Sequence, residues 1–296
     1  MQITKKGIQM KYSIPLFLIS SLLFFGSCKF RSESEKKPLE VMSFNIRLDA
    51  ASDGDNNWKF RKEEVYKMLH YYQPDLLGMQ EVCHNQMEDL KQAMISYQAV
   101  GVGRDDGKQA GEYSPIFFNK KRFTLLEEGH FSLSEKPEQF GLKGWDASYN
   151  RVATWVILQD KDNHNKFIYL NTHLDNDGSV ARKESIKLIL RKIKQISSDL
   201  PVILSGDFNC EPHEEPLHYL EKHKMFNTLH TSEICYGPTY SFHDFGHLTI
   251  DKRVLLDYIF TSNEYATHRY RIVEDKPQNA YLSDHYPVLV RLMLKK

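Results

Sequence analysis

Hydrophobic and polar positions follow strand and helix periods in the first half of the chain. Residues 41–47 alternate and are rich in strand-forming side chains, and residues 75–82 form an apolar run of the buried-strand type. Between them, residues 58–72 place apolar side chains at helical spacing, and Pro74 ends the predicted helix. The same patterns predict a helix over residues 85–94 and strands over residues 97–103, 113–118, 123–126 and 130–133.

The second half repeats the succession of strands and helices. Residues 151–158 and 166–172 flank a polar turn, which predicts a β-hairpin. Apolar positions recur with the helical period over residues 179–196. Further along, the pattern predicts a strand at residues 201–204, a short helix after Pro212, an aromatic loop at residues 236–248, and strands at residues 257–260 and 286–293.

These elements predict the fold class. Strand–helix–strand units occur in both halves without the regular alternation of a parallel barrel, and no linker rich in Pro, Gly or Ser interrupts residues 40–296. We therefore predict a single α/β domain over residues 40–296, in which two mixed β-sheets pack face to face with helices outside.

Composition agrees with a folded domain and sets the N-terminus apart. A hydrophobic content of 41% and a charged content of 26% are typical of a globular, core-forming protein. Three lysines precede an uncharged apolar stretch at residues 14–26, which is too short to cross a bilayer core of ~30 Å as a helix. This pattern predicts a secretory signal over residues 1–27.

Cys28 directly follows Gly26 and Ser27, an arrangement that resembles a bacterial lipoprotein cleavage box. Phe25 departs from the Leu that is usual at the first position of such a box. The alternative is ordinary signal cleavage, which would release a soluble exported protein. We expect lipidation of Cys28, a polar tether over residues 28–39, and a membrane-anchored lipoprotein of the cell envelope.

Charge and cysteine content narrow the functional classes. Removal of the three lysines within residues 1–27 leaves 36 basic side chains against 39 acidic ones. This balance lacks the excess of basic side chains that is typical of nucleic-acid binding, and it disfavours a dedicated nuclease. The other cysteines, at positions 83, 210 and 235, lack a Cys-x-x-Cys spacing, which disfavours a zinc site or a redox pair. Nothing in the sequence indicates the oligomeric state.

Oxygen-bearing side chains stand at the predicted ends of two buried strands. Asn45 lies near the end of the first strand, and Glu81 lies near the end of the next one. A lone acid at a strand end is common, but the pair forms a hard-oxygen site suited to Mg²⁺, with Mn²⁺ as the alternative ion.

A second group of polar residues occurs in segments 206–209 and 283–288. Asp207 and Asn209 are two positions apart and therefore lie on the same side of an extended segment. Beside a divalent cation, such a carboxylate can deprotonate the attacking water while the amide donates to a phosphoryl oxygen. The alternative is a turn that closes a strand. Asp257 can accept from one imidazole nitrogen of His285, so that the other nitrogen faces a phosphate.

Six segments occur in an order that resembles the endonuclease/exonuclease/phosphatase superfamily. They are Ser-Phe-Asn-Ile-Arg, Met-Gln-Glu-Val, Asn-Thr-His-Leu-Asp, Gly-Asp-Phe-Asn, Asp-Tyr-Ile-Phe and Ser-Asp-His-Tyr-Pro-Val, and the resemblance covers residues 40–294. It implies a four-layered α/β sandwich and metal-dependent hydrolysis of phosphoesters.

The resemblance also implies roles for individual residues. It assigns metal binding to Asn45 and Glu81, and catalysis to a group formed by Asp207, Asn209, His173, His285 and Asp257. Glu112 matches the acid that orients the residue equivalent to His173 in the family. Asp284, adjacent to His285, is expected to support the metal ligands as a further carboxylate.

Substrate contacts are predicted from two loops. Arg104 lies on a Gly/Asp loop, where it could reach a substrate phosphate or simply face solvent. Phe242 and His243 belong to the aromatic loop, which either packs on itself or forms a wall for a sugar, an inositol or a base.

Together these features predict a Mg²⁺-dependent phosphoesterase that hydrolyses a phosphate mono- or diester by in-line attack of water. Near-neutral charge and the predicted membrane anchor favour a small or lipid-linked substrate. A secreted nuclease is the first alternative. The second is a binding lipoprotein that has kept the fold without catalysis, although none of the motif residues is missing.

Overall fold

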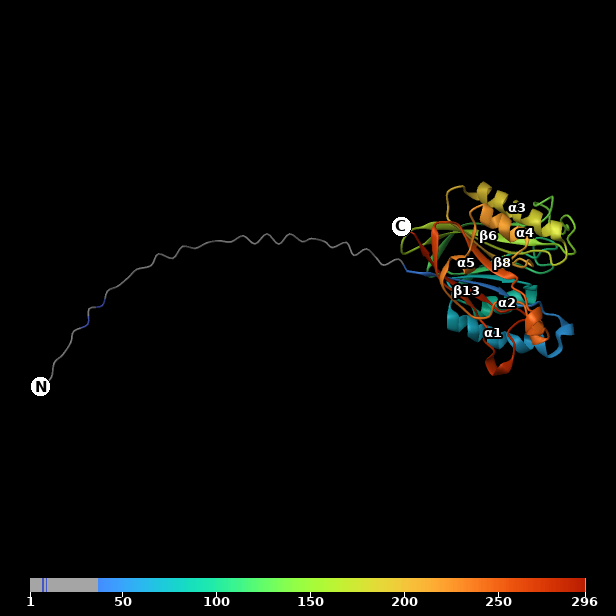
Figure 1. The fold of residues 1–296 in the computed structure, drawn as a ribbon, viewed down its shortest axis with the longest axis horizontal. Coiled ribbons are helices and arrows are strands. Elements are labelled where there is room, and N and C mark those ends of the chain that lie inside the picture. The colour runs from blue at the N-terminus through green and yellow to red at the C-terminus, as the bar shows by residue number, and fades with distance from the viewer. Residues whose placement is uncertain (1–6, 8, 10–36, 296) are drawn as a thin grey trace. The chain divides into compact units, whose positions relative to one another are not determined.

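A computed structural model describes residues 37–295 together with Gly7 and Gln9 (Figure 1). One compact unit, Lys36–Lys296, holds the elements described below. The predicted signal segment, Cys28 and most of the predicted tether lie outside the described residues, so these remain predictions. Within the described part, no helix combines the length and apolar character needed to cross a membrane.

Five α-helices and thirteen strands make up the described part of the domain. The helices are α1 (Trp58–Tyr72), α2 (His84–Ala93), α3 (Ser179–Ile196), α4 (Glu215–Lys222) and α5 (Thr228–Thr231). The strands are β1 (Leu39–Asn45), β2 (Leu76–Gln80), β3 (Tyr97–Val100), β4 (Ile116–Asn119), β5 (Phe123–Ser132), β6 (Val152–Asp160), β7 (Lys166–His173), β8 (Val202–Asp207), β9 (Phe226–Asn227), β10 (Ser232–Tyr236), β11 (Asp257–Thr261), β12 (Tyr265–Ile272) and β13 (Val288–Leu294).

The strands form two mixed sheets. A seven-stranded sheet has the order β10-β12-β13-β1-β2-β4-β3, and a six-stranded sheet has the order β5-β6-β7-β8-β11-β9. Each contains a parallel pair joined by a helical crossover: β1 and β2 across α1, and β7 and β8 across α3. The other neighbours of these four strands run antiparallel.

The domain has four layers, as predicted. Figure 1 shows α3 and α4 on one outer side and α1 and α2 on the other, with both sheets between them. Strand β1 illustrates how alternation builds the layers. Its residues Met42 and Phe44 join the core cluster that includes Val65 and Leu69 of α1, whereas Val41 belongs to the larger core that includes the six-stranded sheet.

A polar network joins the two sheets next to the parallel strand pairs. Asn171 of β7 donates to the backbone oxygen of Met79 at 2.7 Å, and Gln80 donates to the Asn171 Oδ1 at 2.8 Å. Gly78 makes this approach possible, because a Cβ at that position would lie 2.4 Å from the Ser205 Oγ and 2.5 Å from the Asn171 Oδ1. Buried polar groups satisfied in this way fix the relative position of the sheets.

Three differences from the predicted elements follow from tertiary pairing. The two strands predicted at residues 123–126 and 130–133 form the single strand β5, whose pairing with β6 shifts register between Leu125 and Glu127. A bulge of this kind continues the strand through a locally polar stretch. Strands β10 and β12 had no sequence prediction; they pair at the edge of the seven-stranded sheet, where β10 is largely exposed.

Candidate active site

The six predicted segments meet at one edge of the sandwich. β1 ends at Asn45, β7 ends at His173 and β8 ends at Asp207, while Glu81 follows β2 directly. β1 and β2 lie against β7 and β8, so the carboxyl ends of both parallel pairs come together. On β11, which runs antiparallel to β8, Asp257 pairs directly with Asp207.

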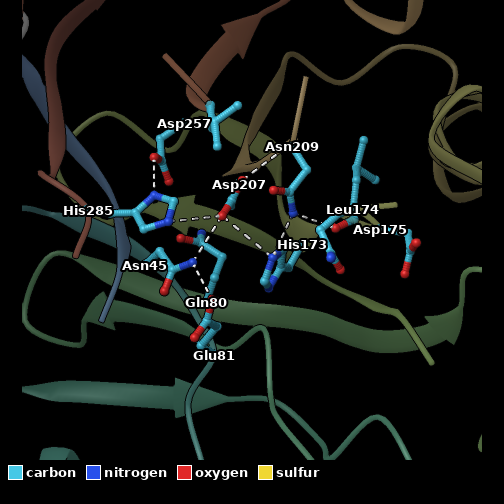
Figure 2. Close-up of polar contacts among 12 residues, drawn as sticks. Asn45, Gln80, Glu81, His173, Leu174, Asp175, Asp207, Asn209, Asp257 and His285 are labelled. Carbon is cyan, nitrogen blue, oxygen red and sulfur yellow. Dashed lines mark hydrogen bonds and ion pairs between the residues drawn. The ribbon is translucent and has the colours of Figure 1, made fainter. Parts of the chain in front are cut away.

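Asp207 lies at the centre of this group, with 1% of its surface exposed (Figure 2). Its Oδ2 accepts a hydrogen bond from the Asn45 Nδ2 at 3.0 Å, and its Oδ1 accepts from the backbone N–H of Asn209 at 3.0 Å. The Nε2 atoms of His173 and His285 lie 3.5 and 3.8 Å from Oδ2. Burial, together with the nearby Asp257 carboxylate, raises the pKa of Asp207 to about 7. A carboxylate with such a pKa can accept a proton at neutral pH.

His285 is held as a cation by two carboxylates. Its Nδ1 lies 2.7 Å from the Asp257 Oδ2, and its Nε2 faces Asp207. Burial alone would lower the pKa of His285, but Asp257 and Asp207 outweigh burial and raise that pKa to about 10. The structure therefore brings together the predicted His–Asp pair.

His173 has the opposite protonation. Burial and the guanidinium groups of Arg151 and Arg104 hold its pKa well below the usual range. Its Nε2 lies 3.0 Å from the Asn209 Nδ2, and the same amide donates to the backbone oxygen of Leu174 at 2.9 Å. A neutral His173 accepts from the amide, so it orients Asn209 toward the site.

Four residues that line the site stand on left-handed backbone, and three of them, Arg47, Glu81 and Asn209, follow the ends of core strands. The φ angles are 60° for Arg47, 61° for Glu81 and 47° for Asn209. Residues other than Gly adopt this region at a cost, and such positions concentrate at functional sites. The alternating pattern of a strand does not predict this left-handed conformation, which directs each side chain out of the strand that precedes it.

Oxygen donors from three segments surround one position beside Asp207. Asn45 donates through Nδ2 to the Glu81 Oε1 at 2.9 Å, which holds the two side chains together. The Nη1 of Arg47 lies 3.8 Å from the Glu81 Oε2 and 3.7 Å from the Asp284 Oδ2. The Glu81 and Asp284 carboxylates therefore already share one cationic group, the Arg47 guanidinium. An all-oxygen donor set with this negative charge fits a hard divalent ion such as Mg²⁺.

A second candidate cluster consists of Asp207, Asp257 and His285, whose ligand atoms all lie within 4.8 Å of one another. The short hydrogen bond between His285 and Asp257 already engages one ligand atom of each. We favour Asn45, Glu81 and Asp284 as the residues for Mg²⁺, because amide and carboxylate oxygens suit this ion better than an imidazole nitrogen does.

A cavity of about 620 Å³ is lined by Glu81, Asp284, Asp207, Asn209, His173 and His285, whereas Asn45 and Asp257 lie behind this lining. Arg104, Glu112 and Phe242 also line it, as predicted substrate or catalytic contacts would. Its remaining polar lining was not predicted from the sequence and comprises Arg47, Tyr149, Arg151, Asn176 and Asp244. Sequence spacing carries no signal for these residues, because they stand on irregular connections whose path depends on the packed sheets.

Two predicted contacts differ from the structure. Glu112 pairs through both carboxylate oxygens with Arg104, at 2.7 and 2.8 Å, and makes no hydrogen bond to His173 within the described residues. His243 is fully buried and packs 4.0 Å from the ring centroid of Tyr286, outside the cavity lining. Its neighbour Phe242 lies 4.9 Å from the His285 ring, because consecutive residues of an extended segment point to opposite sides.

Comparison with known proteins gives related chains and structures. A model of the endonuclease/exonuclease/phosphatase family matches residues 42–285. A family member from Bacteroides vulgatus is 37% identical with a TM-score of 0.85, covering 88% of this chain and 100% of that one. A mannosyl-6-phosphatase from Bacteroides thetaiotaomicron is 33% identical with a TM-score of 0.82, covering 86% and 100%.

A more distant relative is nocturnin of Mus musculus, which is 27% identical over 209 residues. The match covers 62% of this chain and 46% of nocturnin, so the chain spans about half the length of the curated relatives it matches. The family model covers most of the domain, and five of the six motifs contribute side chains to the lining of one cavity. This protein therefore belongs to the endonuclease/exonuclease/phosphatase family, whose members are hydrolases that act on phosphoesters.

Proposed function

We propose that this protein is a Mg²⁺-dependent phosphoesterase that hydrolyses a small phosphate ester, such as a sugar phosphate, by in-line attack of water. The observation that carries the proposal is the position of Asp207. This buried carboxylate lies between a cationic His285 and a neutral His173, beside the oxygen donors Asn45 and Glu81. A proton acceptor beside a cationic donor supports general-base attack of water on a phosphoryl group.

The residues of the chain divide the reaction among them. Asp207 accepts a proton from the water molecule. At the same time, the water oxygen forms the new bond to phosphorus and the ester P–O bond breaks. The His285 cation donates to the phosphoryl oxygens, whose negative charge is redistributed in the transition state, and Asn209 can donate to them once its Nδ2 releases His173 or Leu174. Asp257 holds the His285 ring through Nδ1, which keeps Nε2 directed toward the cavity.

Members of the family generally depend on a divalent metal. Here Glu81 and Asn45, supported by Asp284, would hold Mg²⁺. When bound, the ion supplies Lewis-acid charge that lowers the cost of negative charge on the phosphoryl and leaving-group oxygens.

The choice of a sugar phosphate is supported by two observations. The mannosyl-6-phosphatase of Bacteroides thetaiotaomicron matches over its whole length and exceeds 30% identity. The cavity lining is rich in polar side chains, including Asn176 and Asp244, which can hydrogen-bond the hydroxyl groups of a sugar.

The test is hydrolysis of mannose 6-phosphate, an aryl phosphodiester, RNA and DNA, each with Mg²⁺ and with a chelator. We expect Mg²⁺-dependent release of phosphate from the sugar ester. Asp207→Asn should lower kcat by roughly 10²- to 10⁴-fold, the range that general acid–base catalysis contributes, with little change in Tm. Asp199→Asn, at an exposed loop position away from the cavity, should match the wild type.

Two outcomes would contradict the proposal. Absence of metal-dependent turnover on every phosphoester would favour a binding protein of the same fold. Faster hydrolysis of RNA or DNA than of the sugar ester would favour the nuclease alternative, and its steep decrease with added salt would identify phosphate-backbone binding.

We also propose export and anchoring to the cell envelope through a lipidated Cys28. The basic and apolar pattern of residues 1–27 supports this proposal. Cys28→Ala should abolish incorporation of labelled palmitate and move the protein from the membrane fraction to the soluble one. Unchanged labelling in that variant would exclude Cys28 as the anchor.

A further inference from the structure

The cavity has a second wall that the hydrolytic step above does not use. We call it the arginine wall, and it consists of Arg104, Glu112, Tyr149, Arg151 and Asn176. Two guanidinium groups lie over the Tyr149 ring, with that of Arg104 at 5.3 Å and that of Arg151 at 5.5 Å from its centroid. Stacking on one ring restricts both guanidinium planes before any ligand binds.

Arg151 has unused hydrogen-bonding capacity. Only 5% of its surface is exposed, although it lines the cavity. Its Nε donates to the Asp175 Oδ2 at 3.3 Å and its Nη2 to the Asn176 Oδ1 at 2.8 Å. Its Nη1 is buried and has no hydrogen-bond partner among the described residues. A buried charged donor without a partner is costly, so this nitrogen is suited to a ligand acceptor.

Each arginine of the wall is paired with one carboxylate. Asp175 accepts from the Arg151 Nε and from four backbone N–H groups, those of Ser148, Tyr149, Asp177 and Gly178, and it does not line the cavity. Glu112 is the one carboxylate within the wall, and it pairs with Arg104. The two guanidinium groups therefore face the cavity with a single acid between them.

The wall adjoins the reacting centre. A small space beside the main cavity is lined by Arg104, Glu112, Arg151 and His173 together. His173 in turn contacts Asn209 and Asp207. Asn209, the proposed metal residues Glu81 and Asp284, and the arginine wall therefore all line the cavity in which a phosphoryl group would bind.

We infer that Arg104 and Arg151 bind the non-bridging oxygens of a phosphate dianion and thereby make this protein selective for phosphomonoesters. This inference rests on the proposed function. A monoester presents three non-bridging oxygens and a second negative charge, which suit two guanidinium forks. In a diester, an ester group replaces one of these oxygens and only one charge remains, so the second arginine gains little.

The experiment compares p-nitrophenyl phosphate with methyl p-nitrophenyl phosphate, which share a leaving group and differ in charge. For Arg151→Met and Arg104→Met, we expect kcat/KM for the monoester to fall by roughly 10- to 100-fold, as for the loss of a charge-assisted hydrogen bond. The value for the diester should change by less than about threefold. Inhibition by inorganic phosphate should weaken in parallel with the monoester.

One lysine substitution and one control at a surface arginine complete the set of variants. Arg104→Lys should restore part of the monoester activity, because it keeps the charge without the fork. Arg269→Met, at an exposed position of β12, should leave both esters unchanged. Arg151 is buried, so circular dichroism and Tm establish folding, and Arg104→Met tests the inference if Arg151→Met unfolds.

The outcomes separate this inference from the proposed function. Equal losses on both esters in the arginine variants, or unchanged inhibition by phosphate, would overturn monoester selection while leaving the phosphoesterase assignment intact. Failure of the wild type to hydrolyse either ester with Mg²⁺ would overturn the proposed function itself.

Discussion

At the residue scale, the site gives two imidazoles opposite protonation states through their neighbours. His285 faces the carboxylates of Asp257 and Asp207, which hold it as a cation. His173 is buried near Arg151 and Arg104, which keep it neutral. Two identical side chains can therefore perform different tasks, one donating to phosphoryl oxygens and the other orienting an amide.

Arg47 provides a test of the proposed metal ligands. Its Nη1 lies between Glu81 and Asp284, where it competes electrostatically with a metal ion for both carboxylates. We expect Arg47→Met to tighten Mg²⁺ binding by roughly three- to tenfold, because that competition is removed. Isothermal titration calorimetry measures the affinity directly, and the increase of Tm with Mg²⁺ should be larger than in the wild type.

The control for this prediction is Arg269→Met, which removes the same charge at an exposed position. Mg²⁺ binding there should equal that of the wild type. Unchanged Mg²⁺ binding in Arg47→Met would mean that the ion is held elsewhere, for example at Asp207, Asp257 and His285.

At the element scale, the site depends on two parallel strand pairs that face each other. The crossovers through α1 and α3 return the chain so that β1 and β2, and likewise β7 and β8, end at the same edge. Close approach of the sheets then brings these ends together. Gly78 of β2 permits that approach, since the Ser205 and Asn171 side chains fill the space where a Cβ would stand.

Gly78→Ala should therefore destabilise the fold and disturb the site together. The added methyl group must displace Ser205 or Asn171, and overpacking of this kind costs about 1–3 kcal/mol. Urea denaturation measures the loss. Combining the change with Ser205→Ala should recover part of it, because the nearest clashing atom is removed. Strictly additive losses in the double variant would contradict a steric conflict between these two positions.

At the scale of the whole molecule, the two sheets are joined at opposite ends by different interactions. The catalytic end is joined by the hydrogen bond from Asn45 to Asp207. At the other end, Arg122 pairs with Asp75, just before β2, and with Asp160, at the end of β6. The same guanidinium donates to the backbone oxygen of Pro38 at 2.7 Å, just before β1. All three side chains of this ion cluster are buried.

Arg122→Met should lower the free energy of unfolding by about 3–5 kcal/mol, because it leaves two buried carboxylates without their cation. The kcat of the folded variant should remain that of the wild type, since β1 separates this cluster from Asn45 by its full length. Guanidinium chloride denaturation and initial rates measure the two quantities. Lys192→Met, which removes a pair with the exposed Glu138, should cost less than about 1 kcal/mol.

Local sequence patterns determined the main elements and the identity of the central site residues. Helices α1 and α3 have the predicted bounds, because their apolar positions repeat with a helical period. Asn45, Glu81, Asp207 and His285 could be chosen because each stands at the end of a predicted strand or in a motif with a set order. These signals lie within short stretches of chain and need no knowledge of packing.

Tertiary structure alone decided the contacts between such stretches. Strand register and the paths of connecting loops decide which residues meet. They determine whether Glu112 contacts His173 or Arg104, whether His243 faces the cavity, and whether Arg151 lines it. Edge strand β10 exists only because β12 offers it backbone partners. Interactions of this kind join residues far apart in the chain, and no local period encodes them.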